Sequence, residues 1–255
     1  MSSGRVRIGQ LELDSVTFDQ ALERIVELVD AREGGAVFTP NVDHVVKAET
    51  NDAFRGAYER ADLCLVDGTW LLWASRLLNT PLPEKVSGSD LVGPLCTLAA
   101  GRRWRVYLLG GGAGVARDAA ARMSGEFGVD VVGWDSPLVQ SDGSMGDSDG
   151  ILGRLREAAP DLVLIALGAP KQELWIDRFS GQIAPAVSVG VGGSLDFLTG
   201  RVRRAPPWMS RCGLEWMYRL VQEPRRMWRR YLVDDPRFVA IVIRSWRNGR
   251  RSARR

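Results

Sequence analysis

Short apolar runs alternate with helical hydrophobic periods along the first 200 residues of the chain. The apolar runs are rich in β-branched residues and predict strands at 36–41, 62–68, 105–111, 129–134, 161–168 and 186–193. An edge strand or hairpin is predicted at 6–13, and helices at 17–31, 42–61, 69–78 and 89–100. Strands that are apolar on both faces and separated by helices form parallel sheets covered on both sides. The pattern therefore predicts an α/β fold with a buried parallel sheet.

The composition changes after Gly200. Residues 1–200 carry 18 Lys and Arg against 27 Asp and Glu, whereas residues 201–255 carry 16 Arg against 4 acidic residues. We therefore predict a globular core at 1–200 and a basic, aromatic appendage at 201–255, with the boundary near 201–207. Such a split favours a flat anionic partner.

Arginines alternate with Trp and Tyr over 208–232, the first half of the appendage. Trp and Tyr settle at headgroup depth and Arg binds anionic lipid, so the pattern favours an anionic membrane surface. A nucleic-acid-binding protein that uses the same arginines is the alternative function. A solvated basic face whose aromatics belong to the core is the structural alternative.

Other features exclude whole classes of protein. The sequence has no apolar stretch long enough to span a membrane and no signal peptide, so we expect a cytoplasmic protein with peripheral membrane contact. Three scattered cysteines predict neither disulfides nor a metal site, and we expect all three to be buried: Cys64, Cys96 and Cys212. His44, the single histidine, is expected to be structural. Asp147 and Asp149 match an Asp-x-Asp metal pattern but lie in a Gly- and Ser-rich loop, so we predict no metal site.

Polar residues follow several predicted strands, where ligands of open α/β sheets bind. Asp67 ends one apolar strand and is either a general base with a raised pKa or a helix cap. Thr39 and Asn41 end a neighbouring strand, where they contact a sugar or orient the base. The alternative is that Asn41 or Asp43 caps the next helix.

Three further strand ends carry candidate binding residues. The glycine turn at Gly110, Gly111 and Gly112 suits either a phosphate or tight strand-to-helix packing. It lacks a clean dinucleotide fingerprint, so a nucleotide diphosphate suits it better than NAD. A nicotinamide-dependent dehydrogenase is kept as a second alternative function. Gln172 begins a helix, where it either binds a sugar or phosphate or is simply exposed. Asp196 is either a nucleotide contact or a cap.

Arginines of the appendage are spaced to meet a diphosphate. Arg219, Arg226 and Arg229 lie seven and three residues apart, which places them on one helical stripe unless Pro224 bends the helix. Planar guanidinium groups on such a stripe can form paired hydrogen bonds with phosphate oxygens. The remaining arginines of the appendage, Arg230 among them, would then face lipid.

Taken together, these motifs resemble the WecG/TagA/CpsF family, glycosyltransferase family 26. The resemblance spans Gly9 to Leu232 and is carried by motifs in order: TPNVDH, ADLCLVDG, EKVSGSD, YLLGG, GAPKQE, VGGSLDF, RAPPW and GLEWMYRLVQEPRRMWRRYL. It implies a Rossmann-like fold with a C-terminal appendage that docks on the membrane and completes the active site. It also implies inverting transfer of an N-acetylmannosamine-type sugar or a uronic acid, without a metal or other cofactor. The donor that it implies is a UDP-sugar and the acceptor is a polyprenyl-diphosphate-linked saccharide, with no nucleic-acid partner. Whether the protein self-associates is left open.

The resemblance also assigns roles to residues. It makes Asp67 the catalytic base, and it places seven further residues in the active site: Thr39, Asn41, Lys85, Gln172, Arg219, Arg226 and Arg229. Two positions depart from the family pattern. Lys85 stands where the family usually has Arg, which replaces a bidentate contact with a point charge. Trp70 stands where the family has a second glycine after the base, and is expected to reshape the acceptor pocket.

Overall fold

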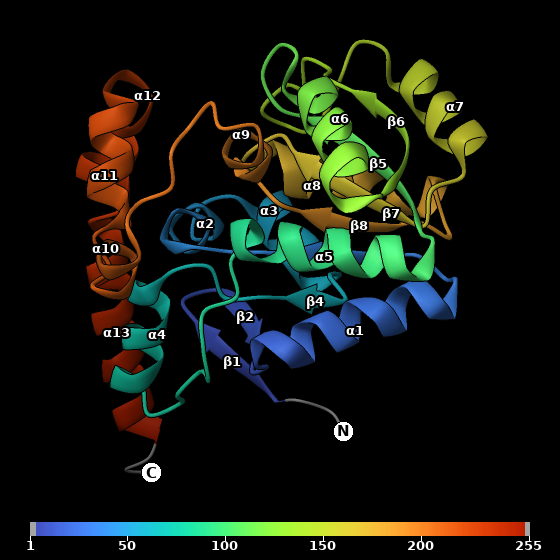
Figure 1. Cartoon of the computed structure of the whole chain (residues 1–255). Coiled ribbons are helices and arrows are strands. Elements are labelled where there is room, and N and C mark those ends of the chain that lie inside the picture. The colour runs from blue at the N-terminus through green and yellow to red at the C-terminus, as the bar shows by residue number, and fades with distance from the viewer. Residues whose placement is uncertain (1–3, 253–255) are drawn as a thin grey trace.

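Six parallel strands form the central sheet of the protein (Figure 1). The computed structural model describes residues 4–252, without the side chains of Pro207, Arg226 and residues 249–252. The spatial order of the strands is β4-β3-β8-β7-β5-β6, and every neighbouring pair is parallel, as predicted. Their bounds are β3 (Gly35–Phe38), β4 (Leu63–Cys64), β5 (Arg105–Gly110), β6 (Asp130–Asp135), β7 (Leu162–Ala166) and β8 (Val187–Gly190).

Helices cover both faces of this sheet. Alternate residues of β7 point to opposite faces, so that Leu162 and Leu164 join one apolar cluster while Val163 and Ile165 join the other. The first cluster lies under α1 (Phe18–Ala31), α5 (Gly88–Arg102), α6 (Val115–Phe127) and α9 (Ser194–Leu198). The second lies under α2 (Val42–Ala48), α3 (Asp52–Glu59), α7 (Ser148–Ala158) and α8 (Lys171–Phe179), and the 3-10 turn η1 (Ser180–Gln182) follows α8. This is the covered sheet that the apolar runs predict.

The predicted N-terminal element is a hairpin of β1 (Arg5–Ile8) and β2 (Leu11–Asp14). The buried Asp14 carboxylate accepts hydrogen bonds from the Cys64 backbone N–H at 2.8 Å and from Arg5 Nε at 3.2 Å. The bond from Cys64 joins the hairpin to β4, an edge strand of the sheet, and the bond from Arg5 joins the two strands of the hairpin.

Three predictions need correction. The single helix expected at 42–61 is two helices, because Asn51 starts α3 by accepting a hydrogen bond from the Phe54 N–H at 2.9 Å. Strand β6 is only partly buried since it is an edge strand, and 48% of Trp134 is exposed. Cys64 and Cys96 are buried as predicted, but Cys212 is exposed at the end of a short C-terminal helix.

Residues 207–252 form a column of helices beside α4 (Thr69–Leu77), at the left of Figure 1. We call them the C-terminal helices: α10 (Pro207–Arg211), α11 (Glu215–Gln222), α12 (Pro224–Arg229), the π-helical turn η2 (Arg230–Asp234) and α13 (Arg237–Ser252). Phe238, Ile241 and Val242 of α13 are buried in the same apolar cluster as Val45 of α2. None of the described helices is long and apolar enough to cross a membrane.

Candidate active site

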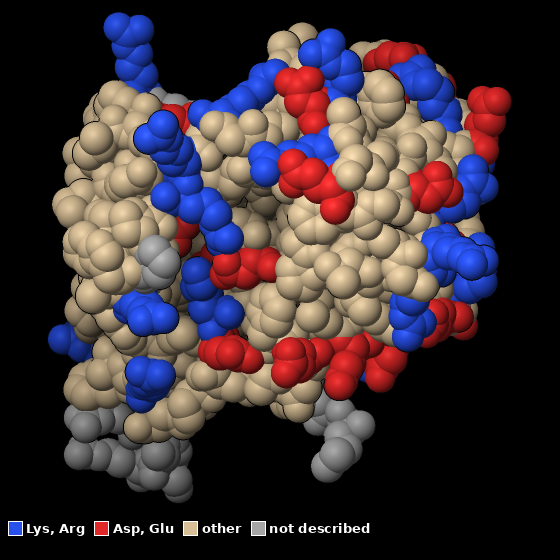
Figure 2. All heavy atoms as spheres, in the orientation of Figure 1, with Lys and Arg blue, Asp and Glu red and all other residues tan. Residues whose placement is uncertain are grey.

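Two cavities meet between the sheet and the C-terminal helices. A polar cavity of about 240 Å³ lies at the carboxyl ends of the strands, and a more apolar cavity of about 410 Å³ lies between α4 and the C-terminal helices. The residues that line both are Asn41, Asp67, Glu215, Arg219 and Arg230. Figure 2 shows acidic and basic side chains gathered along a hollow between the C-terminal helices and the rest of the molecule. The two cavities thus share a charged boundary.

Asp67 lies on this boundary. Its backbone N–H donates to the Pro40 carbonyl at 2.8 Å, which fixes it beside the end of β3. The following helix, α4, has Gly68 as its N-cap residue and no side-chain cap bond, so the carboxylate of Asp67 is not a cap. Burial raises the pKa of Asp67 to about 6; the negative charge of Glu215 adds to this shift, and the positive charge of Lys85 opposes it. A carboxylate with such a pKa is suited to accept a proton near neutral pH.

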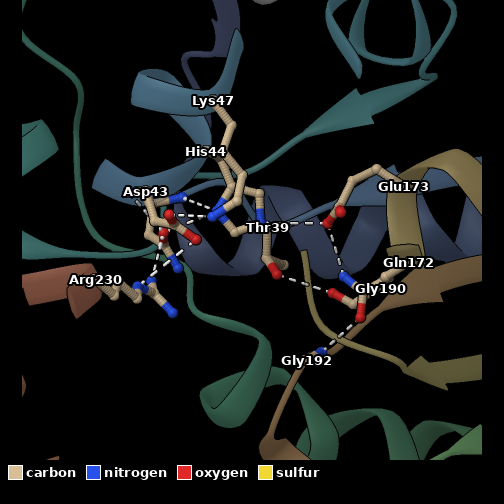
Figure 3. Close-up of polar contacts among 10 residues, drawn as sticks. Thr39, Asp43, His44, Lys47, Gln172, Glu173, Gly190, Gly192 and Arg230 are labelled. Atoms are coloured by element: carbon tan, nitrogen blue, oxygen red, sulfur yellow. Dashed lines mark hydrogen bonds and ion pairs between the residues drawn. The ribbon is translucent and has the colours of Figure 1, made fainter. Parts of the chain in front are cut away.

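Thr39 and Gln172 line the polar cavity from two different segments. Thr39 Oγ1 donates to the Gly190 carbonyl at 2.8 Å. Gln172 is buried rather than exposed, and its Oε1 accepts the Gly192 N–H at 2.9 Å (Figure 3). Both side chains are therefore fixed against the end of β8.

Asn41 is both a helix cap and a wall of the two cavities. Its Oδ1 accepts the Asp43 N–H at 3.1 Å at the start of α2, and it also accepts from Arg230 Nη2 at 2.9 Å. His44 lies behind it, with Nε2 3.3 Å from the buried Glu173 carboxylate (Figure 3). This contact favours the structural role predicted for His44, which also lines the polar cavity.

The arginines differ from their predicted stripe. Helix α11 ends at Gln222 and α12 begins at Pro224, so the proline interrupts the helix and the spacing no longer sets one face. Arg219 lines both cavities, with its guanidinium 5.1 Å from the Phe197 ring, but Arg229 is exposed and lines neither. The side chain of Arg226 lies outside the described part of the structure.

Arg230, which we expected to face lipid, takes a place in the site instead. It lies at the start of the π-helical turn that follows α12, and its Nε is 3.6 Å from the buried Asp43 carboxylate. Its pKa is raised: burial lowers it, but the negative charges around it, that of Asp43 first and those of Tyr231, Asp235 and Asp67 after it, together outweigh burial. Glu215 is a second site residue that sequence reasoning missed. Glu215 lies in the GLEWMYRL motif and Arg230 in the RRMWRRYL motif, but nothing in the sequence distinguishes them from their charged neighbours.

The glycine turn lies outside both cavities. A Cβ on Gly110 would lie 2.6 Å from the Ala166 carbonyl oxygen, and one on Gly111 would lie 2.9 Å from Val115. Gly112 follows in the same turn and also lines neither cavity. These contacts favour the alternative that the glycines permit close packing of β5, β7 and α6.

Asp196 lies in the first turn of α9, whose N-cap residue is Gly193 with no side-chain cap bond. It is therefore not the N-cap. Asp196 itself lines neither cavity, but Ser194 and Phe197 on either side of it line the polar one. Its place beside the polar cavity keeps the predicted nucleotide contact open as an expectation.

The two departures from the family pattern both line the apolar cavity. Lys85 Nζ lies 3.3 Å from Asp90 and 3.9 Å from Glu215, so its charge is shared between two carboxylates. The Trp70 indole donates to the Gly213 carbonyl at 3.1 Å, which joins α4 to the turn between α10 and α11. Trp70 therefore forms part of the wall between the body and the C-terminal helices.

Within residues 4–252, no group of three or more His, Cys, Asp or Glu side chains is arranged to hold a metal ion. The Asp-x-Asp pattern lies away from the two cavities: Asp147 precedes α7, and 70% of its side chain is exposed.

Comparison with known proteins identifies the family of this chain. Residues 6–252 match the glycosyl transferase WecG/TagA/CpsF family. The chain belongs to this family. The match covers the sheet, both cavities and the C-terminal helices, so the resemblance stated from the motifs is confirmed. The protein is a glycosyltransferase of polysaccharide synthesis. This function is therefore preferred to the dehydrogenase and nucleic-acid-binding alternatives.

Two curated relatives of the family cover most of the chain. An N-acetylglucosaminyldiphosphoundecaprenol N-acetyl-beta-D-mannosaminyltransferase of Bacillus spizizenii is 33% identical over 217 residues, 85% of this chain and 81% of the relative. A protein of the same name from Bacillus subtilis is 31% identical over 221 residues, 86% of this chain and 83% of the relative.

Proposed function

We propose that the protein transfers an N-acetylmannosamine-type sugar or a uronic acid from a UDP-sugar to a polyprenyl-diphosphate-linked saccharide. The observation that carries this proposal is the position of Asp67 where the polar and apolar cavities meet. A base at that boundary can contact a sugar donor on one side and a lipid-linked acceptor on the other. The names of the two relatives support an acceptor with N-acetylglucosamine next to the diphosphate and an N-acetylmannosamine donor.

The proposed reaction is a single displacement with inversion. The acceptor hydroxyl loses its proton to Asp67 while its oxygen forms a bond to the anomeric carbon. The bond from that carbon to the diphosphate oxygen breaks on the opposite face, and UDP leaves with the electron pair. A pKa of about 6 leaves most of the Asp67 carboxylate ionised at neutral pH, so it is ready to accept the proton.

Arg219 and Arg230 are proposed to stabilise the leaving diphosphate. Both line the polar cavity, and both belong to the C-terminal helices. Negative charge grows on the diphosphate in the transition state, and fixed cations in a partly dry site stabilise that charge strongly. We therefore propose catalysis without a required metal ion, in which Arg226 is a further candidate from the family resemblance.

The C-terminal helices are proposed to dock on the cytoplasmic face of an anionic membrane. Their outer side, at the left of Figure 2, is mainly uncharged with scattered arginines. Large apolar side chains are exposed on them: Trp208, Met217, Val221, Trp228, Leu232, Val233, Val239 and Ile243. This mixture suits the headgroup region, where apolar side chains are buried and arginines meet anionic lipid. The core at 1–200 would then supply most of the donor site, and the appendage at 201–255 the lipid contact together with Arg219 and Arg230.

Release of UDP tests this proposal. Full-length protein is incubated with a panel of UDP-sugars and a polyprenyl-diphosphate-N-acetylglucosamine analogue in detergent, with and without EDTA. We expect release that requires the acceptor, differs among donors and survives EDTA. Release without acceptor would indicate hydrolysis instead of transfer, and loss in EDTA would contradict the metal-free mechanism. Binding to anionic vesicles in preference to DNA at matched salt is the accompanying test of the membrane surface.

A further inference from the structure

The side chains of Gln172, Glu173 and His44 form a hydrogen-bonded network at the wall of the polar cavity. The proposed mechanism gives no role to the Glu173 carboxylate. Glu173 is fully buried in the first turn of α8, and its Oε1 is 2.9 Å from Gln172 Nε2 and 3.3 Å from His44 Nε2. Its other oxygen, Oε2, is buried without a hydrogen-bond partner among the described residues. Burying a carboxylate in this way costs free energy, so stability alone is a poor reason to keep it.

This network fixes the orientation of the Gln172 amide. The Gly192 backbone N–H can only donate, so the amide atom 2.9 Å away from it is the carbonyl oxygen. The amide nitrogen then faces Glu173, whose carboxylate can only accept (Figure 3). One of the two N–H groups of Gln172 is used by Glu173, and the second remains for the cavity. Gln172 therefore presents a hydrogen-bond donor there.

Thr39 presents a hydrogen-bond acceptor instead. The Gly190 carbonyl can only accept, so the hydroxyl hydrogen of Thr39 is used at 2.8 Å and the lone pairs of its oxygen remain. Both side chains meet at Gly190. A Cβ on this glycine would overlap the Gln172 amide nitrogen and lie 2.9 Å from its Cδ. A donor and an acceptor thus stand side by side on the wall of the polar cavity.

A phosphate oxygen suits only half of this pair, because it would meet the lone pairs of Thr39. A hydroxyl or an acetamido group suits both halves, since each of them donates and accepts. We propose that Glu173, supported by His44, is a positioning residue that holds Gln172 as a donor beside Thr39, so that the pair binds the sugar of the donor substrate rather than its diphosphate. This inference rests on the proposed function and assigns a sugar subsite within it.

A double-mutant cycle tests the inference by calorimetry with UDP and with UDP-N-acetylmannosamine. Glu173→Met removes the acceptor that orients Gln172. We expect it to weaken binding of the UDP-sugar about tenfold, as loss of one buried hydrogen bond does, and to change UDP binding less than about twofold. In a Gln172→Met background the same change should cost less than about twofold, because Glu173 acts through Gln172. Glu173→Gln, which keeps an acceptor oxygen, should restore most of the affinity.

Gly190→Ala is the second variant, for the case in which Glu173→Met does not fold. The three atoms nearest to the new methyl group all belong to the Gln172 side chain, so it should displace the amide and leave the backbone in place. We expect the same selective, roughly tenfold loss of UDP-sugar affinity. Tyr58→Phe is the matched control, because it removes a neighbouring buried hydroxyl that also lacks a partner among the described residues, and it should leave both affinities unchanged.

The possible outcomes separate the inference from the proposed function. Equal losses for UDP and the UDP-sugar would place the Gln172 contact on the diphosphate and overturn the sugar subsite. Additive losses in the double variant would make Glu173 a structural residue only, and normal binding in Gly190→Ala would also overturn the inference. If the unaltered protein binds neither ligand, the proposed function itself fails and the inference fails with it.

Discussion

The polar and apolar cavities are built in different ways. The polar cavity is formed largely by segments that follow β3, β7 and β8, and its side chains are held by hydrogen bonds such as those of Thr39 and Gln172. The apolar cavity is formed by α4 and by α10, α11, η2 and α13, and much of its wall is aromatic or aliphatic: Trp70, Trp216, Tyr231, Phe238 and Val239. One cavity is fixed by the sheet, while the other exists because the C-terminal helices pack beside it.

This difference indicates how the work is divided. Hydrogen bonds of fixed direction discriminate between polar groups, as a nucleotide-sugar site requires. Apolar walls accept many shapes and exclude water, which suits a lipid-linked acceptor. The five residues shared by both cavities lie where the reacting atoms would meet. The following predictions change one cavity, the boundary between the two, or the outer surface of the C-terminal helices that form the apolar cavity.

The largest effect is expected at the boundary itself. Asp67→Asn removes the base, so we expect kcat to fall about a thousandfold while UDP affinity changes less than about twofold. Because burial raises the pKa of Asp67, its ionised form costs the folded protein stability above pH 6, and the Asn variant should melt no lower than the parent. UDP release, calorimetry and thermal unfolding measure the three quantities. Equal loss of turnover and UDP binding would make Asp67 structural.

A pair of adjacent arginines tests which face of the C-terminal helices meets the diphosphate. Arg230 lines both cavities and Arg229 is exposed outside them, so the pair is matched in sequence and in charge. We expect Arg230→Met to lower kcat about a hundredfold, as loss of a transition-state contact does, and Arg229→Met to lower it less than about threefold. Steady-state kinetics at saturating donor measure this. The reverse order would restore the stripe inferred from the sequence.

Two exposed tryptophans test the membrane surface. Trp208 lies on α10, where 60% of it is exposed, and Trp134 lies on the opposite edge of the molecule with 48% exposed. We expect Trp208→Ala to weaken binding to vesicles of phosphatidylglycerol and phosphatidylcholine about fivefold, because it removes an interfacial anchor. Trp134→Ala should not weaken it. Equal loss in sedimentation with vesicles would place the membrane contact elsewhere.

The smallest effect concerns the pH profile. The base must be ionised, so kcat/KM should fall about tenfold per pH unit below the pKa of Asp67, about 6. The negative charge of Glu215 raises this pKa, hence Glu215→Gln should lower it and move the acid limb to lower pH. Glu157→Gln on α7 removes the same charge far from the site, and its profile should stay in place. A Glu215→Gln limb that stays in place or moves to higher pH would contradict this assignment of charges.

Most of the fold could be predicted from the sequence, because the apolar runs and helical periods are local signals. The position of Asp67 beside the cavities could be predicted as well, since a polar residue that follows an apolar strand lies at the carboxyl end of the sheet. Arg230 could not be distinguished from Arg229, because one residue turns a helix by about 100° and the break at Pro224 resets the face. Glu173 gave no signal either, since an acidic residue in a first helical turn is normally exposed.

The glycine turn shows an ambiguity that the sequence could not resolve. Its sequence suits a phosphate-binding loop, yet the close approach of Gly110 to Ala166 is a packing requirement. Only the positions of the neighbouring strands distinguish phosphate binding from close packing. Those positions depend on contacts between residues that are distant in sequence.

The separation of the two cavities is tested most directly by measuring KM for donor and acceptor in one variant of each, with a short-chain acceptor in detergent. Thr39→Val alters only the polar cavity, and Val239→Asp places a charge in the apolar one. We predict that Thr39→Val raises the donor KM about tenfold with the acceptor KM within about twofold of the parent, and that Val239→Asp does the reverse. If either variant raises both KM values equally, the two cavities do not bind donor and acceptor separately, and the account is contradicted.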